Sequence, residues 1–192
     1  MFPSMDESRV LQLFRENGAF LEGHFQLSSG LHSPNYMQSA KILQYPLLAA
    51  ELGADLAKKF SGIDVVLSPA LGGIIIGHEV ARALNVRFIF CEREDNIFRL
   101  RRGFEIRPDE NVLVIEDVVT TGRSTKETIA VAEEAGGIIA GVGCIVNRSN
   151  QDPEFPGKFQ YLLKLPLTNY QPSECRLCQQ QIPLVKPGSR KI

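Results

Sequence analysis

Short apolar runs alternate with amphipathic stretches along most of the 192-residue chain. At 4–17 the apolar residues recur with the spacing of a helix, which Ser4 or Asp6 could cap and Gly18 could end. Residues 23–36 mix aromatics with Gly, Ser and Pro, as in a short hairpin or an ordered loop. The expected helices are 4–17, 45–60, 73–84 and 124–135, and the expected strands are 64–68, 86–91, 112–115, 138–146 and 159–163.

Strands separated by helices predict crossover connections and therefore a mostly parallel sheet. The strands at 112–115 and 138–146 are apolar almost throughout, which is typical of a sheet covered on both faces. The pattern predicts a single α/β domain, with helices flanking a central sheet and an N-terminal extension. Residues 153–172 and 183–192 are rich in turn formers, so the C-terminus is expected to be loop-like.

Composition narrows the class of protein. Lysine and arginine total 21 and aspartate and glutamate total 22, so the net charge is −1 and the isoelectric point is near 6.3. This balance disfavours broad electrostatic binding to nucleic acid or to a membrane surface. The sequence contains no apolar run long enough to cross a bilayer, and its N-terminus does not resemble a signal peptide. With only four cysteines, a cytoplasmic protein is expected.

The segment 112–124, VLVIEDVVTTGRS, carries the clearest chemical signal. An apolar strand leads into Glu116 and Asp117, at the strand end where open α/β sheets bind ligands. The following Thr/Gly/Ser loop opens a helix, so its backbone N–H groups, its hydroxyls and the helix N-terminus suit a phosphate. The paired carboxylates suit sugar hydroxyls or a divalent cation. The alternative is that the acids are ordinary loop charges and the loop only caps a helix; the combination favours a ligand site.

These residues resemble the phosphoribosyl diphosphate signature of the type I phosphoribosyltransferases. The resemblance implies that fold, with residues 1–40 forming a small N-terminal hood, 61–165 the α/β core and 166–192 a loop-rich tail. It implies that Glu116 and Asp117 bind ribose, with Asp117 also catalytic, and that the loop holds the 5′-phosphate. The implied phosphoribosyl diphosphate site comprises Glu116, Asp117, Val118, Val119, Thr120, Thr121, Gly122, Arg123 and Ser124.

Two further loops match the family's pyrophosphate side. Residues 68–73, SPALGG, follow a strand and open a helix, so the resemblance implies a pyrophosphate loop at Ala70, Leu71, Gly72 and Gly73. Many relatives have a lysine here, and backbone amides would replace it; the alternative is a tight turn that needs glycine for packing. Residues 92–103 match a mobile loop that brings basic groups to the pyrophosphate. Arg93 is the first choice for the catalytic role because it follows the strand directly, ahead of Arg99, Arg101 and Arg102.

The base to be transferred is indicated by two other segments. Residues 25–36, FQLSSGLHSPNY, resemble the N-terminal signature of the orotate phosphoribosyltransferases, although many relatives have a lysine at the position of Ser28. Arg148 follows the strand 138–146, where those enzymes have an arginine that pairs with the carboxylate of orotate. A guanidinium can hold a planar carboxylate through two parallel hydrogen bonds. We therefore expect Thr120 and Arg148 to bind orotate; alone, Arg148 could equally be a surface arginine.

The resemblance implies transfer of ribose 5-phosphate from phosphoribosyl diphosphate to orotate, in pyrimidine biosynthesis, by a homodimer. It implies Mg²⁺ held mainly through substrate, without direct protein ligation. The alternatives are a purine phosphoribosyltransferase and a non-catalytic regulator that senses phosphoribosyl diphosphate and binds nucleic acid. A dinucleotide-binding protein is disfavoured because no G-x-G-x-x-G follows the first strand.

Cys175 and Cys178 form a C-x₂-C pair. A structural zinc needs about four ligands, and no histidine follows at a suitable spacing. The pair could meet a second pair across a dimer, but two inert thiols are expected. His24, His32 and His78 are far apart in the sequence and are not expected to cluster.

Overall fold

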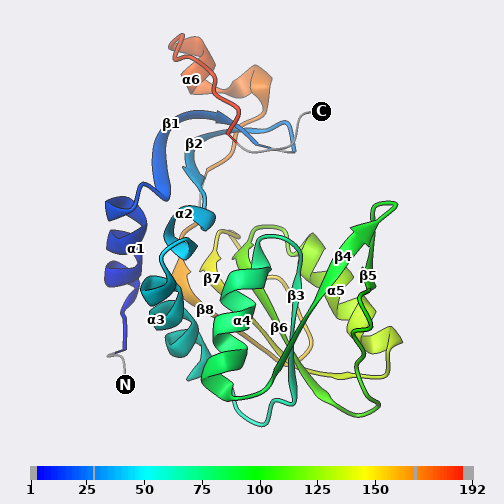
Figure 1. Cartoon of the computed structure of the whole chain (residues 1–192). Coiled ribbons are helices and arrows are strands. Elements are labelled where there is room, and N and C mark those ends of the chain that lie inside the picture. The colour runs from blue at the N-terminus through cyan, green and yellow to red at the C-terminus, as the bar shows by residue number, and fades with distance from the viewer. Residues whose placement is uncertain (1–3, 28, 167, 188–192) are drawn as a thin grey trace.

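The computed structural model describes residues 4–27, 29–166 and 168–187 of the chain. Ser28 and the last five residues of the tail, for which we stated expectations, lie outside this part. Within it, a six-stranded sheet has the order β5-β4-β3-β6-β7-β8 (Figure 1). All neighbouring pairs are parallel except β4 and β5. The strands are β3 (Val65–Pro69), β4 (Arg87–Glu94), β5 (Ile97–Leu100), β6 (Asn111–Val119), β7 (Ile138–Asn147) and β8 (Lys158–Lys164).

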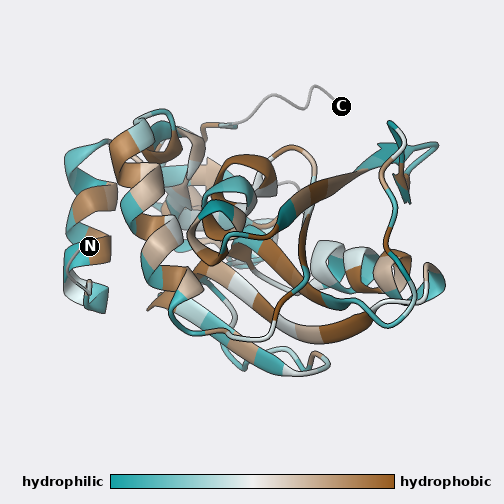
Figure 2. Ribbon diagram, turned by 60° about the horizontal axis from the view of Figure 1, so that its bottom comes forward, coloured by the Kyte–Doolittle hydropathy of each residue, from teal (hydrophilic) through white to brown (hydrophobic). Residues whose placement is uncertain are grey.

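Helices cover both faces of the sheet, as the apolar strands predict. Alternate residues of β6 point to opposite sides: Leu113 and Ile115 pack with the helices α1, α3 and α4, whereas Val112 and Val114 pack with α5. Figure 2 shows the hydrophobic strands running between these layers. The helices are α1 (Glu7–Glu16), α2 (Ala40–Leu43), α3 (Pro46–Ala57), α4 (Gly73–Leu84), α5 (Arg123–Glu134) and α6 (Arg176–Gln179).

The four expected helices are confirmed, and α4 has the expected bounds. Asp6 is the cap of α1, because its carboxylate accepts a hydrogen bond from the Arg9 backbone N–H at 2.8 Å. Gly18 follows the helix with φ +60°, a left-handed conformation that glycine adopts without strain. No helix in the described ranges is both long and apolar enough to span a bilayer.

A separate antiparallel hairpin, β1 (Phe20–Gln26) and β2 (His32–Met37), stands beyond one end of the main sheet (Figure 1). The C-terminal tail, which includes the 3₁₀ turn η1 (Pro172–Glu174) and α6, returns to this hairpin. Tyr170 pairs with His32 on one strand, and Val185 pairs with Phe25 on the other. The hairpin expected at 23–36 is therefore confirmed, and residues at the two ends of the chain lie side by side.

The segment 92–103 differs from the expected loop. Strand β4 continues to Glu94, Asp95 and Asn96 make the turn with positive φ, and β5 pairs back antiparallel. Left-handed Asp and Asn residues suit such a tight turn. The sheet consequently gains an edge strand that the apolar pattern did not predict, since only Phe98 of β5 is buried.

The close packing of α3 on α4 can be tested at Gly53. A Cβ atom at this position would lie 2.5 Å from Glu79 Cβ and 2.9 Å from the Glu79 carbonyl carbon, so the helices would have to separate. We expect Gly53→Ala to lower the free energy of unfolding by about 1–3 kcal/mol, measured by urea denaturation. Leu47→Ala, on the same helix at 74% exposure, is the control and should change it by less than about 0.5 kcal/mol. Equal effects of the two substitutions would contradict this packing.

Candidate active site

The Thr/Gly/Ser loop turns from β6 into α5 around Gly122. This residue has φ +75°, and a Cβ atom there would lie 2.9 Å from the Phe155 ring, so glycine is required on both counts. The loop wraps a hollow of about 50 Å³. The hollow is lined by Glu116, Val118, Val119, Thr120, Thr121, Gly122, Arg123, Ser124 and Thr125. The residues expected to hold a phosphate are thus brought together at the N-terminus of a helix.

Glu116 and Asp117 lie within β6, which runs two residues past them, rather than after the strand as expected. Glu116 is buried, and its desolvation together with the neighbouring charge of Asp117 raises the pKa of its carboxyl well above the ordinary value. The Val118 backbone N–H donates to Asp117 Oδ1 at 2.9 Å, which orients that carboxylate. The chain therefore keeps a carboxyl group in a position that favours its neutral form, as is common at functional sites.

A second hollow, of about 180 Å³, opens beside these acids. Its walls bring the expected pyrophosphate loop, the acids and one arginine of the β4–β5 hairpin into a single pocket. It is lined by Pro69, Ala70, Leu71, Gly72, Arg93, Phe98, Glu116, Asp117 and Ser124. A Cβ atom on Gly72 would lie 2.8 Å from Asp117 Oδ1, so glycine allows the loop to approach the carboxylate. Gly73, by contrast, packs behind the loop against Ile115 and Ser68.

Arg93 is held on the wall of this pocket by three contacts. Its guanidinium lies 4.0 Å from the centre of the Phe98 ring, donates to the Asn96 carbonyl at 2.6 Å and forms an ion pair with Glu127. Burial alone would raise the pKa of Glu127, but hydrogen bonds from Arg93 and Arg123 lower it. The carboxylate is consequently ionised and can position both arginines.

The other arginines of this hairpin lie elsewhere. Arg99 and Arg101 pair with Glu94, and Arg102 pairs with Glu92. None of the three lines the pocket beside Asp117.

A third pocket, of about 450 Å³, lies at the ends of β6 and β7. Val119 and Asn147 are register partners, and the Arg148 backbone N–H donates to the Val119 carbonyl at 2.8 Å. This pairing places Thr120 and Arg148 on one wall, as expected for a shared ligand. The pocket is lined by Thr120, Thr121, Lys126, Arg148, Ser149, Asn150, Gln151, Asp152, Pro153 and Asn169.

Arg148 is half-buried in this pocket, and burial lowers the pKa of its guanidinium, an effect that Tyr36 of β2 opposes. Its Nε atom is buried and has no hydrogen-bond partner among the described residues. A buried cationic donor without a partner is costly, so the arrangement favours an anionic ligand. Arg148 is therefore not the ordinary surface arginine of the alternative interpretation.

The sequence reasoning did not identify seven of the residues that line this pocket, namely Lys126, Ser149, Asn150, Gln151, Asp152, Pro153 and Asn169. Lys126 lies one turn into α5 after the phosphate loop, and that spacing could have indicated it. Asn169 comes from the C-terminal tail, for which no local pattern gave a signal.

Sequence comparison identifies the family. The orotate phosphoribosyltransferase of Caldanaerobacter subterraneus subsp. tengcongensis is 52% identical over 98% of this chain and 100% of its own length. The orotate phosphoribosyltransferase of Chlorobium phaeobacteroides (strain BS1) is 47% identical over 98% of both chains. This chain belongs to the orotate phosphoribosyltransferase family. No protein-family model matches it.

Solved structures agree on the fold. The orotate phosphoribosyltransferase of Mycobacterium tuberculosis superposes with a TM-score of 0.65 at 21% identity, over 83% of this chain and 96% of the other. The adenine phosphoribosyltransferase of Leishmania tarentolae superposes with a TM-score of 0.61 at 16% identity, over 83% and 89%. The fold expected from the Thr/Gly/Ser signature is thereby confirmed. The fold alone does not distinguish an enzyme that acts on orotate from one that acts on adenine.

The raised pKa of Glu116 predicts how the stability of the protein depends on pH. The folded protein favours the neutral carboxyl of Glu116. The free energy of unfolding that this group contributes is therefore fully present below its pKa in the unfolded chain, and it is lost as the pH rises through its pKa in the folded protein. Glu116→Gln keeps the side chain neutral, so we expect it to increase the free energy of unfolding at pH 7 by about 1 kcal/mol or more. Thermal unfolding followed across pH measures this.

Glu133→Gln, an exposed change on α5, is the control and should leave the pH dependence unaltered. A lower melting temperature for Glu116→Gln at pH 7 would contradict the electrostatic account.

Proposed function

We propose that this protein transfers ribose 5-phosphate from phosphoribosyl diphosphate to orotate, giving orotidine 5′-monophosphate and pyrophosphate. The observation that carries the proposal is the buried, unpartnered Nε of Arg148 beside the phosphate loop. Orotate has a planar carboxylate that a guanidinium can bind through two hydrogen bonds, whereas purines lack this group. The full-length relatives named orotate phosphoribosyltransferase support the same substrate.

The three adjoining hollows fit the three parts of such a reaction. Glu116 and Ser124 line both the phosphate hollow and the pocket of Arg93, and Thr120 lines both the phosphate hollow and the pocket of Arg148. The ribose would therefore lie over the acids, with the base on the side of Arg148 and the diphosphate on the side of Arg93. This arrangement separates the acceptor from the leaving group across the anomeric carbon.

Cleavage at that carbon leaves an oxocarbenium-like ribose and a highly charged leaving group. The protein has to position both partners and to stabilise the charge that develops. Asp117 would hold a ribose hydroxyl near the developing cation, and Arg93 would stabilise the departing pyrophosphate. The ring nitrogen of orotate forms its bond to the anomeric carbon as the bond to pyrophosphate breaks, and the proton on that nitrogen passes to the departing pyrophosphate or to solvent.

We also propose that Mg²⁺ assists this reaction. Mg²⁺ prefers hard oxygen ligands, which the diphosphate and the ribose hydroxyls supply, so it would be held mainly through substrate in the pocket beside Glu116 and Asp117. When bound, the ion would neutralise diphosphate charge. We further infer a homodimer, following the family resemblance, and a cytoplasmic location, which four cysteines without a disulfide suit.

Release of pyrophosphate tests the reaction directly. With phosphoribosyl diphosphate present, we expect turnover with orotate and none with adenine or hypoxanthine. The opposite selectivity would establish a purine enzyme, and no turnover with any base would favour a non-catalytic role.

Arg148→Ala tests the acceptor site. Loss of a buried charged partner costs about 2–5 kcal/mol, so KM for orotate should rise about 30-fold or more while KM for phosphoribosyl diphosphate changes little. Arg107→Ala, whose side chain is 67% exposed, is the control. Unchanged orotate kinetics in Arg148→Ala would show that Arg148 does not bind the base.

Arg93→Ala tests the leaving-group side. Removing a donor that acts on developing charge typically lowers kcat by about 10²–10³-fold, whereas KM for orotate should not change. Steady-state kinetics of Arg99→Ala in parallel tests the competing candidate on the same hairpin. Loss of kcat in Arg99→Ala but not in Arg93→Ala would transfer the role to Arg99.

A further inference from the structure

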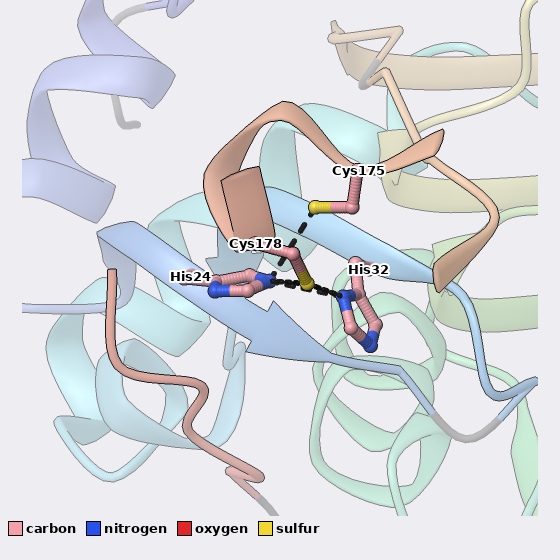
Figure 3. Close-up of side chains that lie close together, drawn as sticks. All are labelled: His24, His32, Cys175 and Cys178. Atoms are coloured by element: carbon pink, nitrogen blue, oxygen red, sulfur yellow. Dashed lines mark hydrogen bonds between the residues drawn. The ribbon is translucent and has the colours of Figure 1, made fainter. Parts of the chain in front are cut away.

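Four metal-binding side chains meet where the tail covers the N-terminal hairpin, away from the three pockets described above. His24 comes from β1, His32 from β2, and Cys175 and Cys178 from the C-x₂-C segment at α6 (Figure 3). One ligand atom of each lies within 4.8 Å of all the others. The expectation that the histidines do not cluster is wrong for His24 and His32, since the hairpin folds them together; His78 lies on α4.

The distances among these atoms are close to those of a tetrahedral metal site. His24 Nε2 lies 3.0 Å from His32 Nδ1, 3.5 Å from Cys175 Sγ and 3.7 Å from Cys178 Sγ. His32 Nδ1 lies 3.3 Å from Cys178 Sγ. With Zn–N bonds of about 2.0–2.1 Å and Zn–S bonds of about 2.3 Å, ligand atoms around a tetrahedral Zn²⁺ are separated by about 3.3–3.8 Å. Three of the four distances fall in this range and the His24–His32 distance is about 0.3 Å shorter, so small movements of the side chains would place all four atoms around one ion.

A hydrogen bond prepares His24 for this role. Its Nδ1 lies 2.7 Å from the carbonyl oxygen of Ile182, which can only accept, so Nδ1 carries the proton. The Nε2 atom then directs its lone pair toward the two sulfurs and His32. Histidines that bind metals commonly donate their other N–H to a backbone carbonyl in this manner.

Burial and ligand type indicate which metal would be held. His24, His32 and Cys175 are 2%, 5% and 1% exposed, and Cys178 lies at the surface. Four protein ligands without an open position are typical of structural zinc rather than catalytic zinc. Thiolate and imidazole are poor ligands for Mg²⁺, which prefers oxygen, so this cluster is distinct from any site for the ion of the reaction.

We propose that His24 Nε2, His32 Nδ1, Cys175 Sγ and Cys178 Sγ bind a structural Zn²⁺ that fastens the C-terminal tail to the N-terminal hairpin. Backbone hydrogen bonds join the same segments on both sides of the cysteines, between His32 and Tyr170 and between His24 and Val185. Asn169, next to Tyr170, lines the pocket of Arg148. The ion would thus support the wall of that pocket without touching the ligand.

Metal content is the primary test. The full chain, purified in reducing buffer without chelator, should contain about one zinc per chain by inductively coupled plasma mass spectrometry. Cys178→Ser and His32→Asn should lose most of this zinc. Cys91→Ala and His78→Asn are the matched controls and should retain it, since Cys91 lies on β4 and His78 on α4.

Measurements on the wild-type chain keep the test decisive if a ligand variant does not fold. Titration with a mercurial thiol reagent should release zinc, detected with a coloured chelator, as the cysteines react. Replacement by Co²⁺ should give the thiolate charge-transfer band and the visible bands of a tetrahedral site. Removal of the metal should lower the melting temperature, because an ion bound only by the folded state stabilises it.

Three results would overturn the proposal. The first is that the wild-type protein contains no zinc and binds no Co²⁺ through thiolate. The second is that the zinc content is unchanged in both Cys178→Ser and His32→Asn. The third is that Cys175 and Cys178 form a disulfide in protein prepared without oxidant. None of these measurements requires turnover. The zinc site and the proposed transferase reaction can therefore fail independently.

Discussion

The parallel register of β6 with β3 and β7 determines where the chemical groups of this protein lie. Val65 pairs with Val112 on one side of β6, and Glu116 pairs with Cys144 on the other. Because parallel strands end at the same edge of a sheet, the loops after β3, β6 and β7 open toward a common site. A shift of β6 by one residue would turn Glu116 and the buried valines to the opposite faces. The apolar packing that holds this register is thus also what aligns the site.

The site itself opposes the stability that the core supplies. Glu116 loses hydration beside a second carboxylate, and Arg148 has a buried donor without a partner in the part of the chain that the structure describes. Both arrangements cost free energy in the unliganded protein, and a bound ligand with hydroxyls and anionic groups would relieve both.

Local patterns predicted the parts of the molecule that local chemistry determines. The helix α4 follows from its periodicity, and the phosphate loop follows from a strand, a glycine and hydroxyls adjacent in the sequence. The antiparallel strand β5 did not follow, because it is only four residues long and only Phe98 of it is buried. The first choice of Arg93 among the four arginines agrees with its place in the pocket beside Asp117, although the pairing of β4 with β5, which the apolar pattern did not predict, determines that place. The spacing between His24 and Cys175 gave no signal either, because their contact depends on a tail that crosses the fold.

The β1–β2 hairpin and the C-terminal tail form a unit that packing against the main core does not hold together. A two-stranded hairpin is marginally stable alone in water, and this one stands apart from the six-stranded sheet (Figure 1). Tail residues pair with both of its strands, and the same unit contributes Tyr36 and Asn169 near Arg148. The phosphate loop, in contrast, is fixed by β6 and α5 within the core. The pocket of Arg148 and the phosphate loop therefore rest on separate structural supports. Under the proposed function, the base pocket could change with the hairpin and tail while the ribose phosphate site stays in place.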